Sequence, residues 1–236
     1  MRILIMFLLL TVECALWGEA LPEWLLPLRN AVFEQVLDSN QIKLLYNDAT
    51  AAAEIDLSDI NLDLALSRCE LLMGQALLNE EKNAIARPYF VNGLRLAEKA
   101  LGVRKSAEAW VLAAENLSRL CQIGPLSYTI ANGLNVEKWA NNALTLDPRN
   151  AQAQYLVAAR WVFAPGLLGN PKKGIEMMTA IFNNSDMDIA DHFNVNSAIG
   201  YGYIQWKKAA EAKPWLLKAQ SIYPANKFVA GLLAKT

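Results

Sequence analysis

The chain has 236 residues, of which 54% are hydrophobic and 19% are charged, so wholesale disorder is excluded. Lysine and arginine number 22, aspartate and glutamate number 23, and the net charge of −1 gives no general electrostatic attraction for nucleic acid. One histidine and three cysteines exclude most histidine-based catalysis, most zinc sites and a disulfide scaffold.

Residues 1–20 are typical of a secretory signal peptide. Arg2 precedes an apolar run over residues 3–12, which is too short for a membrane-spanning helix of ~20 apolar residues. Small residues at Gly18 and Ala20 predict cleavage after Ala20. The sequence therefore predicts an exported protein of the periplasm or cell envelope.

A second interpretation of the same segment is a lipid anchor at Cys14. In a bacterial lipobox the residue before the cysteine is small, whereas this chain has Glu13 there. If the anchor exists, it is the one membrane attachment that we expect, and the product again lies outside the cytoplasm.

The rest of the chain is predicted to be all-α, with about ten or eleven helices. Apolar residues recur every three or four positions, as on one face of a helix, and no strand-like alternation is present. Residues 21–60 are expected to form two capping helices, residues 61–224 four helix pairs, and residues 225–236 a C-terminal capping helix. Two connectors, at 123–135 and 165–171, contain glycine and proline and are expected to be long elaborations.

Two segments of the chain repeat the same pattern of small, large apolar and aromatic residues. The copy that starts at Phe193 contains Gly200, Tyr203, Ala212, Leu216, Ala219 and Pro224. The copy that starts at Ser67 contains Gly74, Leu77, Ala86, Phe90 and Gly93. The pattern resembles the tetratricopeptide repeat, a 34-residue pair of antiparallel helices. This resemblance implies a right-handed superhelix, with the small residues where helices approach each other closely.

A narrower resemblance involves residues 169–176, which are similar to segments of exported bacterial repeat proteins. These include the T-component lipoproteins that accompany TRAP-type solute transporters. The resemblance implies a periplasmic helper protein with a pore or cleft through the helical array.

The tetratricopeptide resemblance also implies that the first helix of each pair lines a concave groove that binds a protein or peptide. Carried over to this chain, the groove residues are Arg68, Leu71, Gln75, Asn79, Glu115, Arg119, Gln152, Tyr155, Asn194, Tyr201 and Gln205. The basic-and-asparagine pattern that clamps a C-terminal carboxylate in some family members is not evident among them.

Few residues point to chemistry. His192 follows Asp191 and is the one candidate for a general base, but no nucleophile stands beside it in sequence. Cys69 and Cys121 are predicted to be buried free thiols, because the repeat register separates them by roughly 18 Å along parallel helices. The acidic stretch 186–191 lacks the glycine and final glutamate of a calcium loop. We expect no enzyme, no metal and no cofactor.

Two functions remain open at this point. The first is a non-catalytic interaction scaffold that binds a protein or peptide in an open groove. The second is a small-molecule carrier or transporter accessory, which a deep apolar cavity near Trp161, Phe163, Tyr128 and Leu167 would favour.

Overall fold

The computed structural model describes residues 21–164 and 169–236, so the predicted signal peptide, residues 1–20, and the alternative anchor at Cys14 lie outside the described residues. The described part contains eleven α-helices and one short 3-10 helix, and it has no β-sheet. The all-α prediction is confirmed. The helices are η1 (Glu23–Leu25), α1 (Leu26–Glu34), α2 (Ser39–Asp56), α3 (Asp59–Asn79), α4 (Asn83–Val103), α5 (Ala107–Ile123), α6 (Leu126–Leu146), α7 (Ala151–Phe163), α8 (Pro171–Asn184), α9 (Ile189–Gln205), α10 (Ala209–Ile222) and α11 (Lys227–Leu233).

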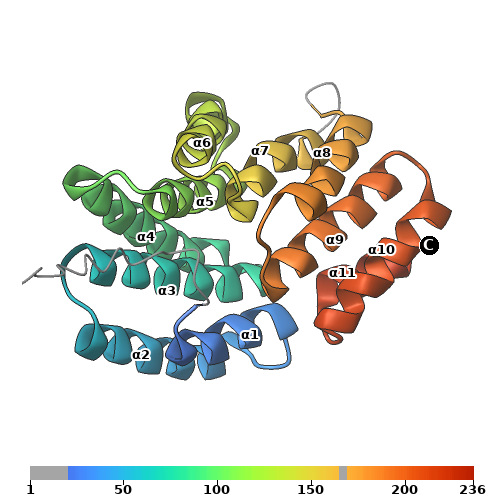
Figure 1. The fold of residues 1–236 in the computed structure, drawn as a ribbon. Coiled ribbons are helices and arrows are strands. Elements are labelled where there is room, and N and C mark those ends of the chain that lie inside the picture. The colour runs from blue at the N-terminus through green and yellow to red at the C-terminus, as the bar shows by residue number, and fades with distance from the viewer. Residues whose placement is uncertain (1–20, 165–168) are drawn as a thin grey trace, which may run out of the picture.

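The helices from α3 to α10 pack as four antiparallel pairs that follow one another along an arch (Figure 1). The first helices of the pairs, α3, α5, α7 and α9, contact one another in series and form the inner row. The second helices, α4, α6, α8 and α10, form the outer row. This sequential packing is that of a helical repeat protein, in which each unit buries its apolar face against its neighbours.

Several helices begin directly after a residue whose side chain caps the first turn. Ser106, Asn150, Asp188 and Asn226 each accept a hydrogen bond from the backbone N–H three residues later. Such a cap satisfies one of the N–H groups that the first turn of a helix leaves without a partner. Pro171 begins α8, where its missing N–H costs nothing.

The pairs α3–α4 and α9–α10 share the same close contact between a glycine and a large apolar side chain. A Cβ atom added at Gly74 would lie 2.6 Å from the ring of Phe90, and one added at Gly200 would lie 2.4 Å from Leu216. Both distances are shorter than real Cβ contacts, so a larger residue at either position would force the facing side chain to move. The prediction that small residues mark the close approach of paired helices is confirmed for these two pairs.

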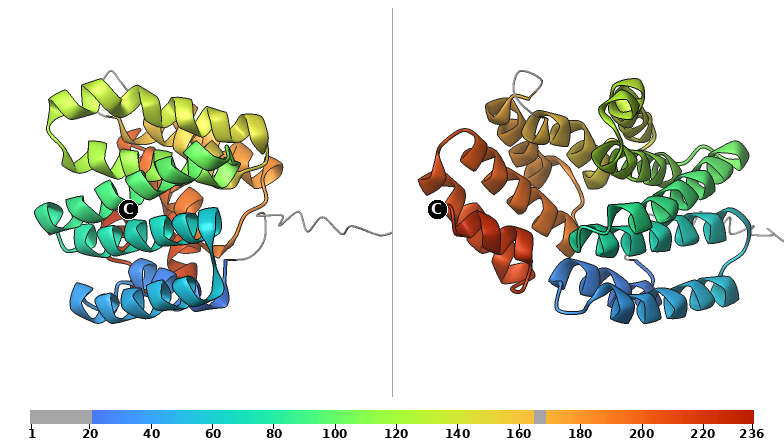
Figure 2. Two further views of the ribbon diagram at one scale, coloured as in Figure 1. Left: turned by 90° about the vertical axis from the view of Figure 1, so that its left-hand side faces the viewer. Right: turned by 180° about the vertical axis from the view of Figure 1, so that it is seen from behind.

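Helix α1 joins the two ends of the arch (Figure 2). The Phe33 ring lies 5.6 Å from the ring of Phe193 in α9 and 5.3 Å from that of Tyr223, just after α10. Asn226 Nδ2 donates a hydrogen bond to the Phe33 carbonyl over 2.7 Å, before α11 begins. The N-terminal helices therefore do not only cap one edge, because α1 also packs against the last helices of the chain.

The prediction of a long connector at 123–135 is wrong. Helix α5 ends at Ile123 and α6 begins at Leu126, so only Gly124 and Pro125 separate the two helices. Pro125 fits there because it immediately precedes the first helical residue. Asn132 and Gly133, residue types common in turns, lie within the predicted connector but are part of α6, where Asn132 Nδ2 donates to the Tyr128 carbonyl over 3.0 Å. Of the second predicted connector, residues 165–168 lie outside the described part of the chain.

Candidate functional site

Charged side chains gather on the inner row of helices. Arg68 on α3 donates a hydrogen bond from Nη2 to Oε1 of Glu108 on α5 over 3.2 Å. Glu115 and Arg119, also on α5, are close enough to interact electrostatically with each other, and Glu115 interacts likewise with Arg68. Tyr155 on α7 lies near both Glu115 and Arg119. We call these five residues the inner charge cluster.

Burial governs the electrostatics of this cluster. Loss of water raises the pKa of the Glu115 carboxyl, although the charges of Arg68 and Arg119 oppose this effect. Glu115 Oε2 is inaccessible to solvent and has no hydrogen-bond partner among the described residues. Burial by itself lowers the pKa of Arg68, but the carboxylates of Glu108 and Glu115 outweigh it and raise that pKa. Burial also raises the pKa of Tyr155 to about 12. An incompletely paired buried charge is costly, so the cluster is a candidate for recognition rather than for stability.

A second group of charges lies where α1 meets the start of α9. Arg29 Nη1 on α1 donates to Oδ2 of Asp188 over 2.6 Å, and the Arg29 side chain is almost fully buried. Asp188 and Asp191 cap the first turn of α9 reciprocally, each accepting a hydrogen bond from the other's backbone N–H. Burial, together with the nearby charge of Asp188, raises the pKa of Asp191 to about 7.

An open cleft of about 450 Å³ lies beside this ion pair, between α1 and the turns around α9 and α10. Its apolar wall includes Val36 and Ile189, which are 68% and 52% exposed. Tyr223 donates a hydrogen bond to Asn30 Oδ1 over 3.3 Å, and Glu34 also lines the cleft. We call this space the seam cleft. Its volume lies within the range of about 300–1,000 Å³ that is typical of ligand pockets.

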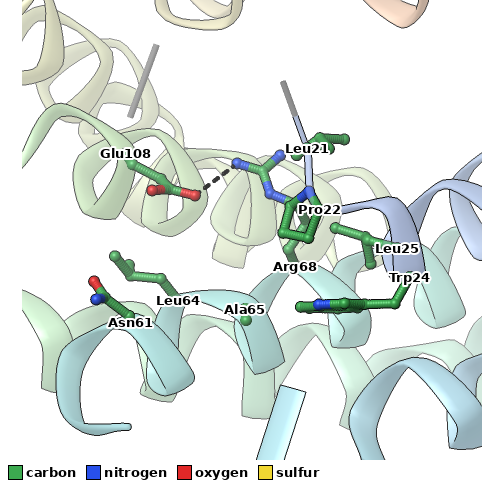
Figure 3. A pocket seen from close by; sticks show the side chains of 9 residues that line it. All are labelled: Leu21, Pro22, Trp24, Leu25, Asn61, Leu64, Ala65, Arg68 and Glu108. Atoms are coloured by element: carbon green, nitrogen blue, oxygen red, sulfur yellow. Dashed lines mark hydrogen bonds and ion pairs between the residues drawn. The ribbon is translucent and has the colours of Figure 1, made fainter. Parts of the chain in front are cut away.

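A smaller cavity lies where the segment before α1 crosses α3 (Figure 3). Leu21, Pro22 and Trp24 cover the Arg68–Glu108 pair on this side, and Asn61 contributes an Oδ1 atom that has no hydrogen-bond partner within residues 21–164 and 169–236. The cavity measures about 10 Å³. That is close to the smallest volume able to hold one water molecule, so it is too small for a ligand.

The structure brings only part of the predicted groove together. Arg68, Glu115, Arg119 and Tyr155 meet in the inner charge cluster. Gln75 and Asn79 bond to each other, and Asn79 Nδ2 donates to the Val32 carbonyl of α1 over 3.1 Å. The groove is therefore not open along its whole length, because α1 occupies the end of α3.

The remaining predicted groove residues lie elsewhere on the inner row. Tyr201 stacks on Phe163 and on Phe228, with ring centroids 5.0 Å and 6.2 Å away. Leu71 packs against two of the apolar core clusters. The other three are half-buried or exposed and make no side-chain hydrogen bond among the described residues: Gln152, Asn194 and Gln205.

None of the eleven predicted residues lines the seam cleft. Sequence reasoning missed the cleft because its two walls come from α1 and from residues near α9 and α10, which are more than 150 positions apart in the chain. The apolar Val36, inside the segment expected to form the first capping helix, was the available signal.

The cavity that would favour a carrier, near Trp161, Phe163, Tyr128 and Leu167, is not assembled as expected. Tyr128 packs against the N-terminal core, whereas Phe163 stacks on Tyr201 of α9. Lys173 Nζ lies 3.5 Å above the Trp161 ring and covers it. Leu167 lies outside the described residues.

The residues considered for chemistry are dispersed. His192 is exposed, with its ring 5.8 Å from that of Phe182, while Asp191 is buried and caps the helix. Cys69 and Cys121 are free thiols as predicted; Cys69 is buried, but Cys121 is only half-buried. In residues 21–164 and 169–236, no group of three or more His, Cys, Asp or Glu side chains is placed to hold a metal. None of the described helices is long and apolar enough to span a membrane.

A comparison of the chain with models of known protein families finds no match. A comparison with curated proteins also finds no match. The fold and the two regions described above, the inner charge cluster and the seam cleft, therefore carry the functional argument.

Proposed function

We propose that this chain is a non-catalytic interaction scaffold of the cell envelope, built from tetratricopeptide-type helix pairs, which binds a protein or peptide partner. The binding site that we propose is the seam cleft, together with the adjoining end of the inner face. One observation carries the proposal: the cleft combines ligand-sized volume with exposed apolar side chains on both walls.

The chemistry of the cleft suits recognition. Val36 and Ile189 offer apolar surface to an anchoring side chain, as at the centre of many interfaces. Asn30 and Glu34 supply polar groups at the same site, which can orient a peptide backbone or a basic side chain. The side chains that line the cleft include no paired nucleophile and base. A partner bound here would contact both ends of the chain at once.

The repeat pattern adds support of a different kind. Pro88 and Pro214 each follow the first residue of their outer helix by five positions, and the glycine contacts of the same two pairs are equivalent. Repeat arrays of this kind commonly present binding surfaces rather than catalytic sites.

Affinity capture of the full-length protein from its native envelope tests the proposal, with mass spectrometry of the proteins that copurify. We expect a recurrent partner that is lost when Val36→Asp and Ile189→Asp are combined, because a charge in each apolar wall must be desolvated on binding. Ile55→Asp is the matched control, since Ile55 is 83% exposed at the end of α2, away from the cleft. Loss of the partner in the control as well would refute the assignment of the site.

A further variant separates the cleft from the inner face. If Arg119→Gln releases the partner and the cleft variants do not, the binding site is the inner charge cluster. The N-terminal peptide of the captured protein tests export in the same experiment: a free N-terminus at Leu21 supports cleavage, and a lipidated Cys14 supports the anchor.

The second candidate function is a small-molecule-binding or TRAP-type transport accessory. One observation favours it: Glu115 Oε2 is inaccessible to solvent, lies close to two arginines and has no hydrogen-bond partner in the described part of the chain. A charged small molecule fits such a cluster better than an extended peptide does, because α1 closes part of the inner face. Native mass spectrometry of the purified full chain would show a retained ligand, and Glu115→Gln would release it.

A further inference from the structure

The first half of α6 exposes an apolar stripe. Leu126, Ile130 and Leu134 are 75%, 71% and 71% exposed, and their spacing of four residues places them on one side of the helix. The fully buried residues of α6, Ala140 and Ala143, both lie in its second half. The first half therefore adds no fully buried side chain to the core, although Tyr128 packs against the core surface.

This stripe differs from the scattered apolar residues that all protein surfaces carry. Its three members are consecutive along one face, and residues 126–136 contain no charged side chain. The helix lies in the outer row of the arch, away from α1 and the seam (Figure 1). Leaving a large aliphatic side chain in water forgoes the favourable free energy of burying it. A contiguous patch of this kind marks an interaction surface.

We propose that the stripe is the contact surface for a second copy of this chain, with the two α6 helices antiparallel about a two-fold axis at Ile130. In this arrangement Ile130 meets its own copy, and Leu126 meets Leu134 of the partner subunit. The stripe is symmetric about Ile130 in both spacing and residue type, as a self-complementary surface requires. Ser127 and Ala131, beside the stripe, are small enough to let the helices approach.

Charge favours a second copy, and the exposed area fits a weak dimer. With no charge in residues 126–136, two copies meet without like-charge repulsion. A helix that lies on a membrane surface instead carries lysine or arginine on its polar face, and this segment has neither. The exposed fractions of the three side chains amount to about 400 Å² per copy, roughly half of what one partner of a standard interface buries. A contact of this size fits a weak dimer that dissociates on dilution.

Sedimentation velocity of the purified full chain over a hundredfold range of concentration tests this proposal. We expect a dimer that dissociates on dilution, and we expect Ile130→Asp and Ile130→Lys each to weaken it at least a hundredfold. An equimolar mixture of the two variants should restore the dimer, because opposite charges then face each other at the two-fold axis. Ile55→Asp, exposed on α2, should dimerise like the unchanged chain.

The design keeps the outcomes separate. All variants carry the same residues 1–20, so association through that segment would be equal in every sample. Ile130 lies outside the core, and a far-UV circular dichroism spectrum checks that each Ile130 variant is folded. If an Ile130 variant is unfolded, Leu126→Asp replaces it in the test. A monomeric unchanged chain overturns the proposal, and so does a dimer that persists in Ile130→Asp or a mixture that stays monomeric. None of these outcomes depends on the seam cleft.

Discussion

The contact between Gly74 and Phe90 gives the most direct test of the helix packing. Replacing Gly74 with alanine adds one methyl group where the Phe90 ring is already 2.6 Å away, and Phe90 is fully buried, so the ring cannot move into solvent. Overpacking of this kind costs about 1–3 kcal/mol. Alanine is favoured over glycine in a helix by up to about 1 kcal/mol, so the net change is a loss of about 0–2 kcal/mol.

Gly102 supplies the control. It lies near the end of α4, and a Cβ added there would meet no atom within 4 Å. Gly102→Ala should therefore raise the free energy of unfolding by about 0.5–1 kcal/mol through backbone entropy alone. The two glycine variants, measured by urea unfolding at 25 °C, should differ by roughly 1–3 kcal/mol.

A double-mutant cycle isolates the contact. Phe90→Ala should cost about 3–5 kcal/mol, since the ring is fully buried. In that background Gly74→Ala should become neutral or stabilising, which corresponds to a coupling of about 1–3 kcal/mol. Additive effects within about 0.5 kcal/mol, or a Gly74→Ala protein as stable as Gly102→Ala, would show that this account of the close approach is wrong.

Three further predictions concern titration, thiol reactivity and the joined ends of the arch. The pKa of Asp191 is raised to about 7, so its stabilising contribution is complete below its ordinary pKa of 3.8 and is lost as the pH rises through 7. The free energy of unfolding should therefore fall by up to ~4 kcal/mol between these two pH values. In Asp191→Asn this dependence of stability on pH should be much weaker. Burial raises the pKa of Cys69 to about 12, so a thiol reagent at pH 8 should modify the half-buried Cys121 first. Peptide mapping that finds Cys69 modified first would contradict the structure. Phe33→Ala should destabilise the chain by about 2–4 kcal/mol, because its ring packs against Phe193 and Tyr223. Amide hydrogen exchange should speed up more in α1 and α11 than in α4 and α5. Equal acceleration in all four helices would argue against a local contact between α1 and the last helices.

The sequence determined the local structure of this protein. Periodic apolar residues and capping side chains predict the helices, because these signals act over a few residues. The pairing of small and large residues also predicted how α3 meets α4 and how α9 meets α10, since the same contact recurs within one hairpin. The main local error, the connector at 123–135, arose because Asn132 and Gly133 are turn residues that an exposed helix tolerates at a modest cost.

Only the tertiary structure decided what the surfaces of the protein are. The inner charge cluster was partly predictable, since Arg68, Glu115, Arg119 and Tyr155 occupy repeat positions that turn inward. Arg29 carried no such signal, because its contact with Asp188 depends on α1 packing across the two ends of the arch. The seam cleft and the exposed stripe of α6 likewise follow from how distant helices are placed, and a one-dimensional pattern does not record which apolar faces find a partner.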